Sequence, residues 1–208
     1  MAEHNELTGT QLHEPKGVAS ADEGTVYTAD GAGSGVWQAP TPPGTLIGFF
    51  DYADLATQTT PISVVGGSSV GDLWTYLPND ALGANTNKTY RPAGVNDVWD
   101  AATGKFDWED LILGDMVDLR LDVTITTTSA NQSIALFLEM ATDSGTPYNI
   151  PFAQGIVKTA GTNIVNQYNG VYMGSSSTLN NRARFKVSSD ANATVTVNGW
   201  YCKVLINR

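Results

Sequence analysis

The segment from Met116 to Thr127 constrains the fold of this chain more than any other. Its sequence, MVDLRLDVTITT, has an apolar residue at every second position and polar or charged residues between them. A repeat of two residues is the period of an extended strand, in which successive side chains point to opposite faces of a sheet. The segment therefore predicts a strand with one buried face and one face in water.

Strands are predicted along the rest of the chain from residue 45 onward. In the segment Ser133–Ala141, Ala135 and Phe137 make the second face partly apolar as well, which predicts burial on both sides. Turn-forming residues separate the segments, and none has the convincing apolar repeat of an amphipathic helix. The predicted strands comprise residues 45–52, 61–65, 72–77, 98–99, 106–108, 116–127, 133–141, 148–157, 163–173, 182–187 and 194–206.

The last of these segments, Thr194–Ile206, is so apolar that we expect it to lie centrally in a sheet. Gly199 interrupts its alternation, and a glycine inside a strand commonly marks a bulge or twist. We expect the apolar side chains before Gly199 to face one way and those after it to face another. The side chains before it are Val195 and Val197, and those after it are Trp200, Cys202, Val204 and Ile206.

The composition is that of an all-β protein with many turns. Of the 208 residues only 15% are charged, and the chain contains 21 glycines. Soluble domains average roughly 25% charged residues, so Thr, Ser, Asn and Gly occupy positions that Glu and Lys would fill in a helical protein. Short antiparallel strands at this spacing predict a β-sandwich for residues 45–208, with the jelly roll as the favoured arrangement.

The first 44 residues have a different character, because they contain too few large apolar side chains to form a core. Within them, Val26–Ala29 and Val36–Gln38 flank a glycine-rich turn and predict a short hairpin. The stretch Ala39–Gly44, APTPPG, predicts a stiff extended spacer. We therefore expect residues 1–44 to be a docking arm with a Pro-rich linker, and residues 45–208 to be a separate head.

The charge balance excludes several classes of partner. The chain has 11 Lys and Arg against 21 Asp and Glu, a formal net charge of −10, and no basic cluster. Nucleic-acid backbones and anionic membranes are bound through clustered basic groups, so neither is an expected partner. We expect neither membrane insertion nor a secretory signal peptide, since no apolar run is long enough for either.

Residues suited to catalysis are sparse. Cys202 is the only cysteine and is expected to be a buried, inert thiol, while both histidines, His4 and His13, lie in the arm. Serine or cysteine hydrolysis and a structural zinc site are therefore not expected, and we predict no cofactor and no enzymatic activity. Carboxylates that could serve a glycosidase or a calcium site crowd one region, but we expect them to be solvated charges. They are Asp107, Glu109, Asp110, Asp115 and Asp118.

Aromatic residues gather between positions 70 and 110. Aromatic rings beside Asn, Asp and Thr are able to stack on sugars, which makes a glycan-binding surface one hypothesis. The favoured alternative is that these rings seal one end of the sandwich or a subunit interface. The candidates for glycan contact are Trp74, Tyr76, Trp99 and Trp108.

Several stretches resemble the virion proteins of tailed bacteriophages. LTGTQLHEPKGV, residues 7–18, and GTVYTADGAGSGVWQ, residues 24–38, are similar to the N-terminal segments of fibre, head-fibre and decoration-type proteins. GDMVDLRLDVTITT (114–127), VYMGSSSTLNN (171–181) and ATVTVNGWYCKVLI (193–206) look like parts of their jelly-roll heads. The resemblance implies a homotrimer with a head like those of tumour necrosis factor and C1q, and it carries over no catalytic residues.

From this resemblance we expect a protein of the virion surface, made in the host cytoplasm. The first expectation is a capsid decoration or head-fibre protein, whose arm docks on the major capsid protein or a tail protein. Its docking residues would be Leu7, Leu12, His13, Glu14, Pro15 and Lys16. The second is a tail fibre or receptor-binding protein that recognises a host-surface glycan, and the third is a depolymerase using carboxylates near residues 107–110.

Overall fold

The computed structural model of the protein describes residues 21–29, 35–38, 46–78 and 86–207. The chain divides into two compact units, Met1–Gly44 and Thr45–Arg208. In the first unit, strands β1 (Val26–Ala29) and β2 (Gly35–Gln38) form an antiparallel hairpin. The predicted hairpin is therefore present, with its second strand one residue longer at the start.

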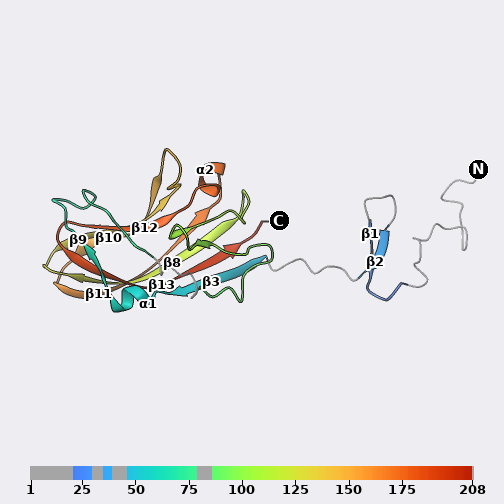
Figure 1. The fold of residues 1–208 in the computed structure, drawn as a ribbon, viewed down its shortest axis with the longest axis horizontal. Helices are drawn as coiled ribbons and strands as arrows, with labels where there is room; N and C mark the ends of the chain where they lie inside the picture. The colour runs from blue at the N-terminus through green and yellow to red at the C-terminus, as the bar shows by residue number, and fades with distance from the viewer. Residues whose placement is uncertain (1–20, 30–34, 39–45, 79–85, 208) are drawn as a thin grey trace, which may run out of the picture. The chain divides into compact units, whose positions relative to one another are not determined.

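The second unit is an antiparallel β-sandwich (Figure 1). One sheet has the order β10-β9-β12-β5, and the other has the order β11-β8-β13-β3 with β4 paired to β13. The predicted all-β fold is confirmed. The elements of this unit are β3 (Ile47–Ala53), α1 (Leu55–Thr59), β4 (Ile62–Val64), β5 (Thr75–Tyr76), β6 (Trp99–Asp100), β7 (Lys105–Phe106), β8 (Met116–Thr127), β9 (Gln132–Met140), β10 (Tyr148–Val157), β11 (Gly161–Tyr172), α2 (Ser176–Leu179), β12 (Arg184–Ser189) and β13 (Ala193–Leu205).

The core lies between the two sheets, and β8 and β9 supply much of it. Along β8, the alternate residues from Val117 to Ile125 are buried, while the residues between them face outward. On β9 the second face is also covered, with Ala135 buried and Phe137 half-buried, as its sequence predicts. Leu119 and Leu138, one from each sheet, are completely buried against the shared core.

Strand β13 lies between β8 and β3, which confirms its predicted central position. The register with β8 shifts between Val197 and Gly199, so the predicted bulge is present. The expectation that the two halves of the strand face different ways is wrong. The extra residue resets the alternation, and Val195, Trp200 and Cys202 are all buried in the same core. A Cβ atom at residue 199 would lie 2.1 Å from the carbonyl oxygen of Tyr52, so only glycine fits against β3 here.

Two short helices were outside the sequence prediction. α1 begins after Asp54, whose carboxylate accepts a hydrogen bond from the Thr57 amide at 2.9 Å, and α2 begins after Ser175, whose hydroxyl accepts one from the Thr178 amide at 3.2 Å. Each helix is about one turn long, which is too short to produce a helical apolar repeat. Among the residues of these described ranges, no helix has the length and apolar character needed to cross a membrane.

Candidate functional site

The arm residues predicted to contact a virion lie outside the described residues. These are Leu7, Leu12, His13, Glu14, Pro15 and Lys16. The β1–β2 hairpin of the same unit is described, and all four residues of β1 are exposed. Tyr27 and Trp37 lie opposite each other in the hairpin, with ring centroids 5.4 Å apart. Since an isolated two-stranded hairpin is at best marginally stable in water, pairing with a further strand would stabilise this one.

Two of the four aromatic residues considered for glycan binding belong to the core. Trp108 is only 1% exposed and Trp99 only 7% exposed. Phe106 packs against both, with ring centroids 5.0 Å from Trp99 and 5.6 Å from Trp108. A ring enclosed by other side chains has no face to offer a sugar, so the structure corrects the glycan prediction for Trp99 and Trp108. Both rings fill the sandwich interior instead.

The other two, Trp74 and Tyr76, lie on the outer side of the β10-β9-β12-β5 sheet. The ammonium group of Lys186 lies 4.6 Å from the centroid of the Trp74 ring. The guanidinium carbon of Arg184 lies 3.4 Å from the centroid of the Tyr76 ring. Each ring is thus already engaged by a cation of the same chain, and glycan binding by these two residues remains a prediction.

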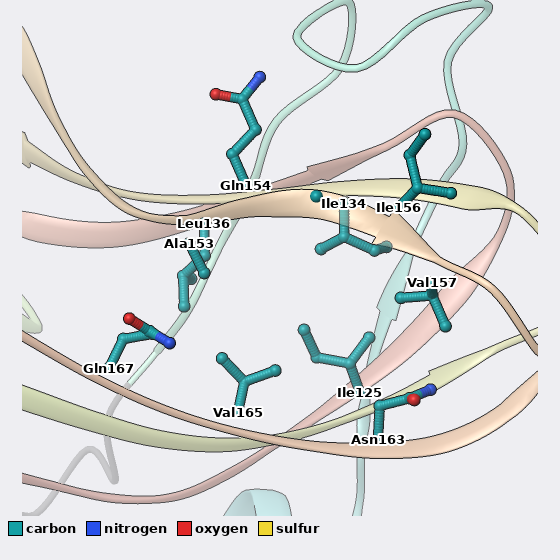
Figure 2. Close-up of a pocket in the computed structure, with 11 residues that line it drawn as sticks. Ile125, Ile134, Leu136, Ala153, Gln154, Ile156, Val157, Asn163, Val165 and Gln167 are labelled. Atoms are coloured by element: carbon teal, nitrogen blue, oxygen red, sulfur yellow. The ribbon is translucent and has the colours of Figure 1, made fainter.

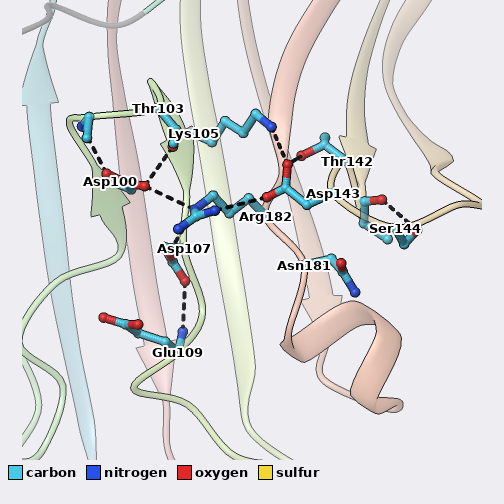
Figure 3. Close-up of polar contacts among 12 residues, drawn as sticks. Asp100, Thr103, Lys105, Asp107, Glu109, Thr142, Asp143, Ser144, Asn181 and Arg182 are labelled. Atoms are coloured by element: carbon cyan, nitrogen blue, oxygen red, sulfur yellow. Dashed lines mark hydrogen bonds and ion pairs between the residues drawn. The ribbon is translucent and has the colours of Figure 1, made fainter.

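The carboxylate region is organised around one arginine (Figure 3). The Arg182 guanidinium forms ion pairs with Asp100 at 3.0 Å, Asp107 at 2.9 Å and Asp143 at 3.1 Å, and Lys105 also pairs with Asp143. These contacts join the β6–β7 hairpin to the turn after β9 and to the start of β12. Asp107, expected to be a solvated charge, is instead part of an ionic cross-link between loops.

The pKa values of Asp100 and Asp143 do not suit a general acid. The Thr103 hydroxyl, a backbone amide and Arg182 together hold the pKa of Asp100 below its ordinary value, against the opposing effect of burial. Hydrogen bonds from Lys105 and then Arg182 lower the pKa of Asp143 in the same way. A glycosidase acid needs a raised pKa in order to hold a proton near neutrality, so this arrangement favours a structural role.

Glu109 is exposed, as expected of a solvated charge, whereas Asp115, Asp110 and the thiol lie in structural surroundings. Asp115 is fully buried and accepts hydrogen bonds from the amides of Ile112 at 2.9 Å and Asn207 at 2.8 Å, which differs from the solvated charge expected. Asp110 accepts one from the Asn96 amide at 2.7 Å. Burial raises the pKa of the Cys202 thiol, in agreement with the predicted inert cysteine. Within the described ranges, no group of three His, Cys, Asp or Glu residues is arranged to hold a metal.

A cavity of about 220 Å³ opens between the sheets beside β10 and β11 (Figure 2). Figure 2 shows Ile125, Val165 and Ile134 in its apolar interior, with the amide side chains of Gln154 and Gln167 nearby. Its lining contains no acidic, basic or thiol side chain. The cavity therefore has no group suited to acid–base or nucleophilic catalysis.

The outer face of the β11-β8-β13-β3 sheet, which we call the open face, carries large apolar side chains in water. A row of four residues crosses the sheet in register: Tyr172 on β11 pairs with Met116, Met116 with Leu205, and Leu205 with Ile47 on β3. Tyr172 is 60% exposed and Ile47 is 56% exposed. Contiguous exposed apolar side chains are a common feature of interaction surfaces.

The β3 side of the open face contains an aromatic hollow of about 370 Å³. The Phe49 ring forms its centre, stacked on Tyr90 with centroids 5.2 Å apart and tilted against Tyr201 at 5.4 Å. The full lining is Ile47, Gly48, Phe49, Thr89, Tyr90, Arg91, Tyr201 and Lys203. Sequence reasoning included Tyr90 in the aromatic cluster but missed the hollow, because β3 and β13 are distant in sequence.

Two ion pairs lie on the open face. Asp118 binds Lys203 at 2.9 Å, and Arg120 binds Asp122 at 3.0 Å. Burial opposes the ionisation of Asp118, but hydrogen bonds from Lys203 and Tyr168 outweigh it and lower the pKa of Asp118. These four residues add no net charge to a chain whose total is −10.

No protein-family model matches this chain, and no curated protein matches it. Similar solved structures include one of the infectious bursal disease virus Gt strain, with 5% identity, a TM-score of 0.45 and coverage of 84% of this chain and 36% of that chain. Eiger TNF from S. frugiperda has 12% identity and a TM-score of 0.40 over 79% of this chain and 94% of that chain. PRD1 vertex protein P5 has 11% identity and a TM-score of 0.35, with coverage of 90% of this chain and 84% of that chain. This chain thus spans little more than a third of the first of these.

Proposed function

We propose that this chain is a non-enzymatic structural protein of a bacteriophage virion surface, and that it acts as a homotrimer. The observation that carries the proposal is the open face, where a row of exposed apolar side chains crosses the sheet in register. Water-exposed apolar area of this kind is stabilised when copies associate, and closed symmetric oligomers are the rule for such association.

The bacteriophage assignment rests on the sequence resemblance of residues 7–38 and of the three head segments. A capsid decoration or head-fibre protein is the first choice, with the arm docking on the major capsid protein or a tail protein. The β1–β2 hairpin supports a docking role because its exposed strands would gain hydrogen bonds and apolar contacts from a partner. The ion pairs that Arg182 makes with three carboxylates support a non-enzymatic role.

The test of docking is removal of the arm. A variant lacking residues 1–38 should fail to bind virions that lack this protein, while its head stays folded and soluble. Sedimentation of the particles with bound protein measures the attachment, and circular dichroism checks the fold. Attachment of the shortened chain at the level of the full chain would contradict the docking arm.

A receptor-binding role is the second candidate, and the aromatic hollow is the observation that favours it. Phe49, Tyr90 and Tyr201 offer ring faces beside Thr89 and Arg91, a combination able to stack on and hydrogen-bond a sugar. Binding of the full chain to a host glycan on an array, lost in a Tyr90→Ala variant, would support it. A depolymerase would instead release reducing ends from host polysaccharide and lose that activity in Asp107→Asn.

A further inference from the structure

We infer that the open face joins copies of this chain asymmetrically, with the β11 edge of one copy seated in the aromatic hollow of the next. The inference rests on the proposed function, because it names the contact through which the proposed trimer forms. The partner is thus a second copy of this chain, and the two contacting surfaces are different from each other.

The hollow is built in advance of any partner. The amide of Phe49 donates a hydrogen bond to the carbonyl oxygen of Tyr90 at 3.0 Å, which holds the loop before β6 against β3. A Cβ atom at Gly48 would lie 2.5 Å from that same oxygen and 2.4 Å from the nitrogen of Pro92, so glycine is what allows this close approach. Tyr90 consequently stands at the rim, 61% exposed yet stacked on Phe49. A pre-formed site avoids much of the ordering cost of binding.

The β11 edge has the chemistry of a ligand for this hollow. Its twelve residues, Gly161–Tyr172, include no Asp, Glu, Lys or Arg. Ile164, Tyr168 and Tyr172 nevertheless point outward and are more than half exposed. Tyrosine presents an apolar ring with a polar tip, and such residues are enriched among the anchors of interfaces.

The positions of the two surfaces determine the symmetry. They lie at opposite edges of one sheet, with β8 and β13 between them. Neighbouring strands are about 4.8 Å apart, so about 14 Å separates β11 from β3, and one copy cannot fill its own hollow. A contact between two different surfaces is heterologous, and it closes into a ring when the rotation between copies permits. A ring of three copies buries three identical contacts.

Charge favours this pairing over other contacts between copies. The chain carries a net charge of −10, so two copies repel each other over most of their surface. The hollow is flanked by Arg91 and by Lys203, which is paired with Asp118, whereas the β11 edge that would enter it is uncharged. The approach of one copy's tyrosine ring to Arg91 is favourable, because the face of the ring is electron-rich.

The test uses two variants of the full chain, Tyr172→Asp at the edge and Tyr90→Asp in the hollow, with Leu73→Asp as the matched control. Leu73 is 48% exposed and precedes β5 of the other sheet. Native mass is measured by light scattering after size exclusion, for each variant alone and for an equimolar mixture of the first two. Circular dichroism melts confirm that each variant is folded.

We expect the wild type and Leu73→Asp to have the mass of three chains. Tyr172→Asp and Tyr90→Asp should each weaken association by at least about thirtyfold, the effect of losing an interface anchor. Their mixture should recover a species of two chains, because the intact edge of one variant fits the intact hollow of the other.

Two results overturn the inference and leave the proposed assembly standing. In the first, the wild type is trimeric and both variants keep its mass, so the copies meet elsewhere. In the second, both variants dissociate but their mixture recovers nothing, so the contact is not between edge and hollow. A monomeric wild type would overturn both the inference and the proposed trimer.

Discussion

The outer faces of the two sheets differ in how far the chain itself covers them. The outer side of the β10-β9-β12-β5 sheet is covered by the chain itself over β9 and β12, because the segment before β5 packs there, whereas Ile156 on β10 stays exposed. Trp74 from that segment packs on Phe137 at 5.3 Å, and the Gly71 amide donates to the Ser188 hydroxyl at 2.8 Å. The open face of the other sheet is covered by its own chain only at the β3 side among the described residues, where Tyr90 stacks on Phe49, and Tyr172 and Met116 remain in water.

This difference explains where each sheet places its charges. Under the covering segment, Lys186 and Glu139 are both buried and pair at 2.6 Å, and Arg184 adds a second contact to Glu139 at 2.9 Å. On the open face, Asp118 and Lys203 pair at 2.9 Å but remain partly exposed. A sheet face covered by its own chain encloses its ion pair, whereas the pair on the uncovered part of the open face stays partly in water.

Removal of one buried charge should have the largest effect on stability. Glu139→Ala leaves Lys186 buried without its carboxylate, and we expect a loss of about 3–5 kcal/mol in the free energy of unfolding. The matched change on the open face, Asp118→Ala, should cost only about 0.2–1 kcal/mol, because its pair is partly exposed. Urea denaturation measures both, and equal losses would contradict the comparison between the two faces.

Core substitutions should affect the two sheets equally. Leu119→Ala and Leu138→Ala each remove a fully buried side chain from the same core, and we expect each to cost about 2–5 kcal/mol. Thermal and urea unfolding provide the measurement. A cost below roughly 0.5 kcal/mol for either would mean that the corresponding strand does not face the core.

Loss of the cover should have a smaller effect. Trp74→Ala removes a half-buried ring from Phe137 and from the Lys186 ammonium, and we expect a cost of about 2 kcal/mol. The variant should also bind more of a hydrophobic dye, because the outer side of this sheet becomes accessible. Unchanged stability together with unchanged dye binding would show that the segment does not cover the sheet.

The smallest effect is expected at the Arg182 cluster. The pKa values of Asp100 and Asp143 are lowered in the folded chain, so their contribution to stability is present above the unfolded value, near 3.8, and is lost as the pH falls through the folded values. Arg182→Gln removes a cation that lowers both pKa values. It should make the loss of stability below about pH 5 shallower, as measured by urea unfolding at each pH. An unchanged pH dependence would mean that Arg182 does not lower these pKa values.

The two-residue repeat of apolar side chains and the amino-acid composition are enough to predict most of the fold. Strand β8 has the bounds predicted from alternation, β10 has the predicted bounds 148–157, and the glycine at residue 199 predicts the bulge. The sequence does not show that a bulge keeps Val197 and Trp200 on the same face, since that depends on the register with β8. Residues 61–65 and 72–77 flank a Gly-Gly turn, yet β4 and β5 pair with different sheets.

The candidate surface was less accessible to sequence reasoning. Exposed and buried aromatic residues have the same local composition, so Trp99 and Trp108 could not be told apart from Tyr90. The hollow forms where β3, β13 and the loop around Tyr90 meet. Its lining residues on β3 and on β13 are more than a hundred residues apart in the sequence. Only the alternation on β8 indicated which residues would face outward, and it could not indicate whether anything covers them.

The native mass of residues 1–208 and of residues 45–208, measured by light scattering after size exclusion, tests the central claim most directly. The open face belongs entirely to the head, so we predict that both forms have the mass of three chains. Monomers in both forms would contradict the claim that this face joins copies of the chain. Three chains only when the arm is present would also contradict it, because the arm hairpin would then be the element that holds the trimer together.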